Sequence, residues 1–445
     1  MMSHSGKAVV RSSVAGVARR AKAASRQLAV LNTARRNDVL LAAADLIEER
    51  KAEILLANDV DCRAAAQMVE EGRMPRAMFE RLQTSERGIK QMATGVREVA
   101  ALDDPLGLVL SITELDDELT LSRVTCPLGV VGIIFESRPD VIPQVGALAL
   151  KSGNALLMKG GREAAHTNET LINIWHEAIN RFADVPVDAL HLLNTREDVT
   201  EMLALDGLID LIIPRGSREF VAYVAEHSRI PVLGHGEGVC HVYVDLAADL
   251  SKALAIAFDS KTQYPAACNA AETLLVHEAV AAEFLPEMIA QFGRARVEVR
   301  GCPRTIALAQ SPEVIPADEN DWATEYSDLI IAVRVVASLD EAVEHIHLYG
   351  SGHTESIVTE DVPTATRFLE TVDAAGVYHN ASTRFADGFR YGFGAELGIS
   401  TSKLHARGPV GLEGLTTYKY LLTGNGQIVA TYSKGERTFK HRKLK

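Results

Sequence analysis

The chain has 445 residues, which is too long for one ordinary hydrophobic core and predicts about two or three domains. Its formal net charge of −13 argues against a nucleic-acid-binding protein, because such proteins usually carry a basic surface. No run of about 18 apolar residues occurs, so the sequence predicts no membrane span. A small anionic substrate is compatible with this charge, because a local basic pocket does not require a basic protein.

Five cysteines are scattered along the chain and include no C-x-x-C pair. Such a set argues against a disulfide framework or a bound metal and favours a reducing compartment, so we expect a cytoplasmic protein. Each cysteine by itself is most simply a small buried hydrophobe, but one of them could be a catalytic thiol. They are Cys62, Cys126, Cys240, Cys268 and Cys302.

The first hundred residues are predicted to be mainly helical. Residues 1–37 contain no acidic residue and several arginines, a composition typical either of a transit peptide or of a basic amphipathic helix. Further on, between Asn37 and Asn58, apolar residues recur at helical spacing with charges on the opposite face. This stripe consists of Val39, Ala43, Leu46, Ile47 and Ile54.

From Gly129 onward, short apolar runs alternate with helical segments, which predicts a doubly wound parallel sheet. Ligands of such sheets bind at the carboxyl ends of the strands, so the glycine-containing turns 159–162 and 214–218 are candidate ligand loops. The predicted strands are 130–135, 155–161, 188–193 and 208–216, and the predicted helices are 142–151, 162–182 and 196–205.

A second α/β series begins near His241. Its predicted strands are 241–245, 272–277 and 329–336, and its predicted helices are 247–260 and 279–293. The C-terminal part is glycine-rich from Gly388 to Gly414 and ends in a basic tail.

Charged residues and glycines follow three of the predicted strands. Lys159 and Arg162 flank a Gly-Gly pair and suit a ribose 2′-phosphate, hence NADP, although a solvated loop has the same composition. Gly216 and Ser217 open a helix and suit an anion, or else a simple N-cap serine. The string FESRPD (135–140) suits a phosphate or carboxylate site, or else a salt bridge at a strand end.

Two further strings concern the reaction centre. GHGEG (234–238) looks like half a dinucleotide fingerprint, but it leads into a strand rather than a helix, so we interpret it as a tight turn near the active site. Cys268 lies in QYPAACNAAETLLV (263–276), where small neighbours give the access that a reactive thiol needs.

Taken together, these strings resemble the aldehyde dehydrogenase superfamily and, within it, the γ-glutamyl phosphate reductase family, over roughly residues 14–435. The tail string and NASTRF are typical of the reductases rather than of the superfamily. The resemblance rests on PLGVVGIIFESRP (127–139), KSGNALLMKGG (151–161), LIIPRGS (211–217), GVCHVYVD (238–245), KTQYPAACNAAETLLV (261–276), VYHNASTRFADG (377–388), FGAELGISTSKLHARGPVGLEGLTTYKY (393–420) and GNGQIV (424–429).

The resemblance implies an α/β fold with a Rossmann-like NADP-binding domain, an α/β catalytic domain and a small oligomerisation arm. It implies a homo-oligomer, a dimer or a tetramer. It begins near Val14, which favours an ordinary helix over a transit peptide. The implied boundaries are 12–109 with 128–240 for the first domain, 241–408 for the second, and 110–127 with 409–445 for the arm and tail.

Residue by residue, Cys268 falls on the nucleophile of the superfamily. Lys159, with Arg162 beside it, aligns with the lysine that contacts the adenosine ribose. Gly216 and Ser217 align with the turn beside the pyrophosphate, and Glu325 aligns with the glutamate that holds the nicotinamide ribose.

Two departures from the hydrolytic members matter. Gly234 stands where they have a water-activating glutamate, and Ser137 stands where they have an oxyanion asparagine. Both weaken an aldehyde-to-acid oxidation, whereas Arg138 next to the site suits a phosphate leaving group.

The implied activity is the NADPH-dependent reduction of L-glutamyl 5-phosphate to L-glutamate 5-semialdehyde and phosphate through a Cys268 thioester, the second step of proline biosynthesis from glutamate. Arg138 and Arg215 are candidates for the departing phosphate, and Ser137 is a candidate oxyanion donor together with the Cys268 N–H. The candidates for the α-amino acid end of the substrate are Asn380, Ser382, Thr383 and Arg384.

A separate glutamate 5-kinase is the implied pathway partner, because the chain has no Walker-type kinase loop to make the labile acyl phosphate. The alternatives are a thioester-forming aldehyde dehydrogenase for another small acid and a non-catalytic scaffold. The intact set of Cys268, Lys159, Ser217 and Glu325 argues against the scaffold.

Overall fold

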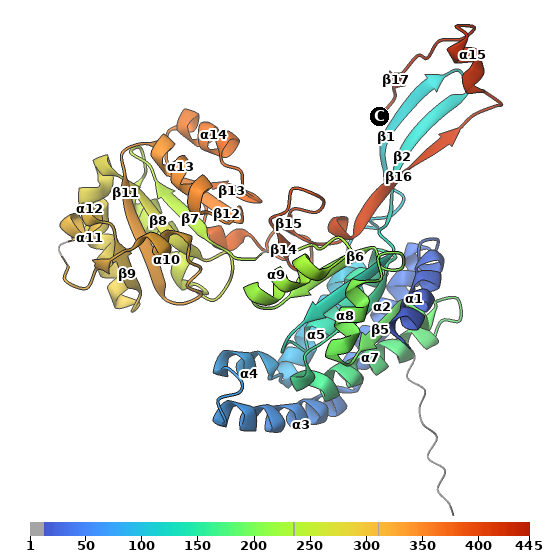
Figure 1. Cartoon of the computed structure of the whole chain (residues 1–445), viewed down its shortest axis with the longest axis horizontal. Coiled ribbons are helices and arrows are strands. Elements are labelled where there is room, and N and C mark those ends of the chain that lie inside the picture. Colours follow the sequence, from blue (N-terminus) through green and yellow to red (C-terminus); the bar gives the residue numbers. More distant parts are fainter. Residues whose placement is uncertain (1–12, 235, 310) are drawn as a thin grey trace, which may run out of the picture.

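The computed structural model describes residues 13–234, 236–309 and 311–445, which form two lobes and a projecting arm (Figure 1). Arg11 of the basic segment and residue 12, where the proposed first domain begins, lie outside the described residues. Within the described ranges, no helix is both long and apolar enough to cross a membrane.

The first lobe begins with a run of helices, as the sequence predicts. Several start at a side-chain cap: Ser13, Asn32 and Ser85 each accept a hydrogen bond from a backbone N–H three residues on. The apolar stripe predicted between Asn37 and Asn58 is buried in the core of this lobe. The helices are α1 (Val14–Leu28), α2 (Thr33–Glu49), α3 (Lys51–Glu70), α4 (Arg76–Leu82) and α5 (Glu86–Ala101).

A parallel sheet with the strand order β5-β4-β3-β6 forms the centre of this lobe. The predicted strand 188–193 begins only at Leu190, because residues 187–189 form a 3₁₀ turn. The strands are β3 (Val130–Phe135), β4 (Ala155–Lys159), β5 (Leu190–Leu193) and β6 (Leu211–Arg215), and the helices are α6 (Val141–Lys151), α7 (Ala165–Asn180), α8 (Arg196–Leu203) and α9 (Arg218–His227).

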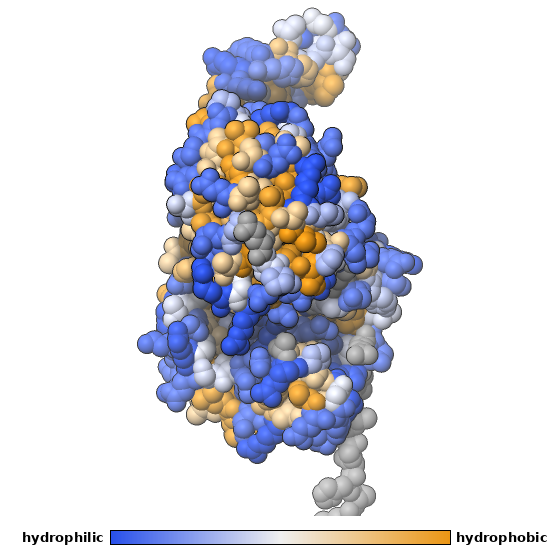
Figure 2. Space-filling model, turned by 90° about the vertical axis from the view of Figure 1, so that its left-hand side faces the viewer, coloured by the Kyte–Doolittle hydropathy of each residue, from blue (hydrophilic) through white to orange (hydrophobic). Residues whose placement is uncertain are grey.

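The second lobe contains a seven-stranded parallel sheet with the order β10-β9-β11-β8-β7-β12-β13. The predicted strands at 241–245, 272–277 and 329–336 are confirmed to within one residue. The strands are β7 (Cys240–Val244), β8 (Ala271–His277), β9 (Glu298–Gly301), β10 (Ile315–Pro316), β11 (Ile330–Val336), β12 (Thr354–Val358) and β13 (Gly376–His379), with helices α10 (Leu250–Thr262), α11 (Glu278–Arg294), α12 (Pro303–Ala309), α13 (Leu339–Tyr349) and α14 (Val362–Thr371). Figure 2 views the molecule from this lobe and shows an apolar area below the arm, with mainly polar residues beneath it.

The arm is an antiparallel sheet with the order β16-β2-β1-β17. Its strands are β1 (Val109–Asp116), β2 (Leu119–Pro127), β16 (Thr416–Thr423) and β17 (Arg442–Lys443), and α15 (Val429–Ser433) lies near its tip. β16 is an edge strand whose large side chains are exposed in the single chain, including Tyr418, Tyr420, Leu421 and Leu422.

Between the second sheet and the arm, the chain returns to the first lobe. Ala395, Leu397, Val410 and Leu412 pack in the core of the first lobe, around the short pair β14 (Ile399–Ser400) and β15 (Gly408–Pro409). This return brings the preceding glycine-rich segment and Glu396 to the junction of the lobes.

The Trp175 side chain fills the centre of the first lobe, where it is fully buried against the Cα of Gly146. We expect Trp175→Ala to reduce the free energy of unfolding by about 3–5 kcal/mol, because it leaves a large cavity. Urea unfolding followed by circular dichroism should show a lower midpoint. Val30→Ala, at an 85% exposed side chain, serves as the control, and equal midpoints for the two variants would contradict the packing argument.

Candidate active site

Cys268 lies in the connection between α10 and β8, and a buried ion pair joins the two ends of this connection. The Nζ of Lys261 lies 2.5 Å from Oε2 of Glu272, and both side chains are fully buried. The other oxygen of Glu272 accepts a hydrogen bond from the backbone N–H of Ser327 at 3.3 Å. Burial raises the pKa of Glu272 to about 7, while Lys261 acts in the opposite direction. The pair therefore holds the cysteine loop against the segment that carries Glu325.

A second segment, residues 236–239 that lead into β7, contacts the backbone of Cys268 directly. A Cβ at Gly238 would lie 1.9 Å from the carbonyl oxygen of Cys268, so only glycine fits there. The Gly238 N–H donates to Oε2 of Glu325 at 3.0 Å, and the Cys240 thiol donates to the Cys268 carbonyl at 3.3 Å. The end of the predicted 234–238 turn therefore lies near Cys268 as expected, while residue 235, in its middle, lies outside the described residues.

The thiol of Cys268 is partly exposed, yet its surroundings disfavour the thiolate. Burial raises the pKa of Cys268 to about 12, and the carboxylates of Glu325 and Glu396 add to this effect, while Arg384 opposes it. A ligand that neutralises these carboxylates, or a change in solvation, is needed before the thiol ionises at neutral pH.

Arginines gather on the other side of the same site. Burial lowers the pKa of Arg215 to about 10, and the neighbouring charge of Arg138 lowers it further, whereas Glu396, Asp140 and Cys268 act in the opposite direction. The Nη1 of Arg215 is buried and has no hydrogen-bond partner in the described part of the chain. A buried cationic donor without an acceptor is a ready site for an anion.

The sequence analysis missed Glu396. Burial raises the pKa of its carboxyl, which accepts a hydrogen bond from the Gly388 N–H at 2.8 Å. Its one signal in the sequence is that it is an isolated acidic residue in the glycine-rich segment 388–414, which is too weak to assign a role.

The two hydrogen-bond donors of Ser137 are not free to stabilise an oxyanion. It has a positive φ of 38°, and both its N–H and its hydroxyl donate to Oε1 of Glu163, at 2.7 and 2.6 Å. In this conformation, both donors are occupied, so the expectation that Ser137 would be available to an oxyanion needs correction.

Most of the residues expected at the α-amino acid end of the substrate also have their polar groups occupied by the protein. The Asn380 amide bonds to Thr359 through both its oxygen and its nitrogen. The hydroxyl of the buried Ser382 bonds to Ser260 at 3.1 Å, and the Thr383 N–H donates to Ser260 at 3.2 Å. Asn380 and Ser382 thus hold β13 and the 381–386 segment against their neighbours, whereas the hydroxyl of the buried Thr383 has no hydrogen-bond partner among the described residues.

Arg384 is the exception within that group. Its Nε donates to Gln263 at 2.9 Å, and its guanidinium lies over the ring of Tyr264 at 5.8 Å. These contacts bring its charge to the cysteine loop, where it favours the thiolate of Cys268. Arg384 therefore acts electrostatically on the Cys268 thiol.

The expected cofactor residues, apart from Glu325 in the second lobe, lie at the carboxyl ends of β4 and β6, the two strands beside β3. Lys159 is 7% exposed, and its Nζ donates to the Gly160 carbonyl. Arg162 is exposed at the start of a 3₁₀ turn, and Gly216 is exposed before α9. Ser217 caps α9 by accepting from the Phe220 N–H at 3.3 Å, as its simple N-cap interpretation requires.

The two parallel sheets, the arm and a thiol at the lobe junction define an oxidoreductase of the aldehyde dehydrogenase type. A model of the "Aldehyde dehydrogenase family" matches residues 7–306. The chain therefore belongs to this family, whose members typically use a nicotinamide cofactor.

Within the family, the chain belongs to the γ-glutamyl phosphate reductases, which carry out the reductase step of proline biosynthesis. It is 54% identical to the reductase of that name from Cyanothece sp., over 96% of this chain and 97% of the relative, and 53% identical to that of Haloquadratum walsbyi, over 95% and 93%. The crystal structure of γ-glutamyl phosphate reductase from Thermotoga maritima superposes with a TM-score of 0.90 at 42% identity, over 94% of this chain and all of that one.

The contact between Gly238 and Cys268 gives a sharp test. Gly238→Ala should lower kcat/KM by about 100-fold or more, because an added Cβ displaces the Cys268 backbone. Gly236→Ala, in the same turn, meets no atom within 4 Å and should stay within about twofold of the parent. Steady-state kinetics and circular dichroism measure both; normal activity of a folded Gly238→Ala variant would contradict the contact.

The raised pKa of Cys268 predicts a pH dependence in the ligand-free protein. Alkylation of the Cys268 peptide by iodoacetamide should speed up about tenfold per pH unit between about pH 7 and 9, because only the thiolate reacts. Glu325→Gln removes a negative charge, lowers this pKa and should accelerate alkylation, whereas Arg384→Gln should slow it. Peptide mass spectrometry gives the rates, and a rate that is already flat at neutral pH would refute the raised pKa.

Proposed function

We propose that this chain reduces L-glutamyl 5-phosphate to L-glutamate 5-semialdehyde and phosphate with NADPH, through a thioester on Cys268. The observation that carries the proposal is a partly exposed cysteine near a half-buried arginine, Arg215, whose buried Nη1 has no acceptor among the described residues. Gly234 supplies no side chain that could activate water, so a thioester formed here would last long enough to be reduced.

In the first step, the sulfur of Cys268 attacks the acyl carbon of the substrate. A carbon–sulfur bond forms, the bond from that carbon to the phosphate oxygen breaks, and the departing phosphate carries away the thiol proton. Arg215 and Arg384 stabilise the negative charge that accumulates on the leaving group. Substrate binding also offsets the burial that disfavours the thiolate.

The residues at the carboxyl ends of β4 and β6 suit a dinucleotide cofactor that carries a ribose 2′-phosphate. Lys159 and Arg162 supply two cations, and the exposed Gly216 and Ser217 supply the start of α9, a helix of 10 residues whose first N–H groups favour an anion. We assign the nicotinamide ribose to Glu325. When bound, NADPH supplies the hydride that reduces the thioester carbonyl.

In the last step, the carbon–sulfur bond breaks, the sulfur regains a proton, and the aldehyde leaves. The backbone N–H of Cys268 is our first oxyanion donor, and Ser137 can contribute only if its N–H or hydroxyl is released from Glu163.

Several wider proposals accompany this activity. We retain the division into a cofactor domain (12–109 with 128–240), a catalytic domain (241–408) and an arm with tail (110–127 with 409–445). The exposed edge strand β16 supports a homo-oligomer, a dimer or a tetramer, in which this strand is covered. A separate glutamate 5-kinase supplies the acyl phosphate, and we propose that the enzyme works in the cytoplasm.

Replacement of the nucleophile tests the proposal. Cys268→Ser should lower phosphate-dependent NADP reduction with glutamate semialdehyde by at least about 1,000-fold, because a serine hydroxyl lacks the nucleophilicity and leaving ability of the thiol. Cys62→Ser is the control, since its thiol bonds to Asn58 alone among the described residues and a hydroxyl can replace it. Ordinary turnover by Cys268→Ser would refute the nucleophile, and faster turnover of simple aldehydes than of the semialdehyde would refute the substrate.

A further inference from the structure

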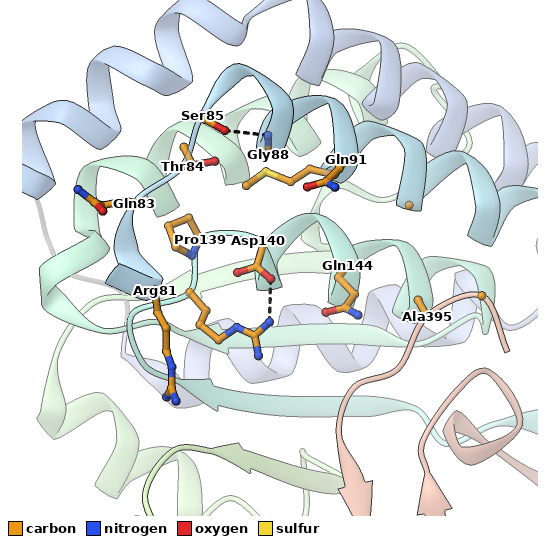
Figure 3. A pocket seen from close by; sticks show the side chains of 14 residues that line it. Arg81, Gln83, Thr84, Ser85, Gly88, Gln91, Pro139, Asp140, Gln144 and Ala395 are labelled. Carbon is orange, nitrogen blue, oxygen red and sulfur yellow. Dashed lines mark hydrogen bonds and ion pairs between the residues drawn. The ribbon is translucent and has the colours of Figure 1, made fainter. Parts of the chain in front are cut away.

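A cavity of about 390 Å³ lies on the first lobe, outside the residues that the proposed reaction uses for its cofactor. It is enclosed by the end of α4, the start of α5, the start of α6 and the returning segment at 394–395 (Figure 3). Its volume is within the usual range for small-ligand sites, about 300–1,000 Å³.

The charges in this cavity are complementary to a zwitterion. Arg81 and Arg138 are its two cations, and Asp140 is its only acidic lining residue. Arg81 has no hydrogen-bond or ion-pair partner in the described part of the chain. The Nη2 of Arg138 donates a hydrogen bond to Oδ2 of Asp140 at 3.0 Å. Other N–H groups of its guanidinium remain available to a ligand.

Neutral hydrogen-bonding groups complete the lining. Gln91 and Gln144 extend from the facing helices α5 and α6 (Figure 3), and neither side chain bonds to another residue that the structure describes. Their amides can each donate and accept, which suits a ligand that has a carboxylate and an ammonium side by side.

The cavity is connected to the reaction centre through shared residues. Arg138 lines the cavity and lies three residues after Phe135, which pairs with Arg215 in the sheet. The charges of Arg215 and Glu396 in turn act on the Cys268 thiol. Ala395 lines the cavity and is the immediate chain neighbour of Glu396. A substrate whose acyl phosphate lies at Cys268 could therefore extend past Arg138 into this cavity.

We propose that this cavity binds the α-amino acid end of the substrate, with the α-carboxylate on Arg81 and Arg138 and the α-ammonium on Asp140. The proposal rests on the proposed function and refines it. It replaces the earlier expectation for Asn380, Ser382 and Thr383, because the cavity offers charged groups for the two charged ends of the substrate, whereas the amide of Asn380 and the hydroxyl of Ser382 are occupied and Thr383 carries no charge.

Three aldehydes separate the two charged contacts in the phosphate-dependent reduction of NADP. L-Glutamate 5-semialdehyde carries both groups, 5-oxopentanoate lacks the amine, and 4-aminobutanal lacks the carboxylate. Arg81→Gln should raise KM by about tenfold or more for the first two aldehydes and leave KM for 4-aminobutanal unchanged. Asp140→Asn should raise KM by a similar factor for the semialdehyde and 4-aminobutanal but not for 5-oxopentanoate.

Arg87→Gln is the matched control, because Arg87 is an exposed arginine near the start of α5 that does not line this cavity. It should leave all three KM values unchanged, and circular dichroism should show that every variant is folded. Equal KM changes for all three aldehydes, or no change in either variant, would overturn the inference. Absence of turnover of the semialdehyde by the parent enzyme would instead overturn the proposed function.

Discussion

The close approach of Gly238 to the carbonyl of Cys268 is the constraint on which the rest of the site depends. The chain passes from the first lobe into β7 through residues 236–239, so this contact connects the segment between the lobes to Cys268, the proposed nucleophile. Glu325 holds these residues from a third segment through the Gly238 N–H. The buried ion pair between Lys261 and Glu272 joins the two ends of the connection that carries Cys268. Burying an ion pair costs desolvation energy, so this pair contributes a defined geometry rather than added stability.

The same burial explains the electrostatics of the site. Removal from water disfavours the thiolate of Cys268, the carboxylate of Glu396 and the guanidinium charge of Arg215 alike. These groups occupy a common environment in which an incoming acyl phosphate would supply the acceptor that Arg215 lacks. Under the proposed function, the ligand-free site is arranged for an anionic substrate, and the raised pKa of its thiol limits other reactions until that substrate binds.

Much of this arrangement could be predicted from the sequence. The strands β3, β7 and β8 are short apolar runs, and Cys268 and Ser217 stand in recognisable local contexts. β12 was missed because Thr354, Glu355 and Ser356 are polar but fully buried, so the strand lacks an apolar signature.

Contacts between residues that are far apart in the sequence could not be predicted from the local sequence pattern. Nothing near Ser137 indicates that Glu163 takes both of its donors, and nothing in a glycine-rich segment indicates that Glu396 reaches the lobe junction. The same limit applies to Asn380, whose amide looks available in the sequence but bonds to Thr359 in the fold.

The covalent intermediate on Cys268 can be tested most directly by rapid acid quench and peptide mass spectrometry. The enzyme is mixed with glutamate semialdehyde and NADP in the absence of phosphate, so that the acyl group has no phosphate to accept it. The account predicts a glutamyl adduct on the Cys268 peptide that disappears when phosphate is added. NADP reduction without any adduct on Cys268, or an adduct confined to another cysteine, would contradict it.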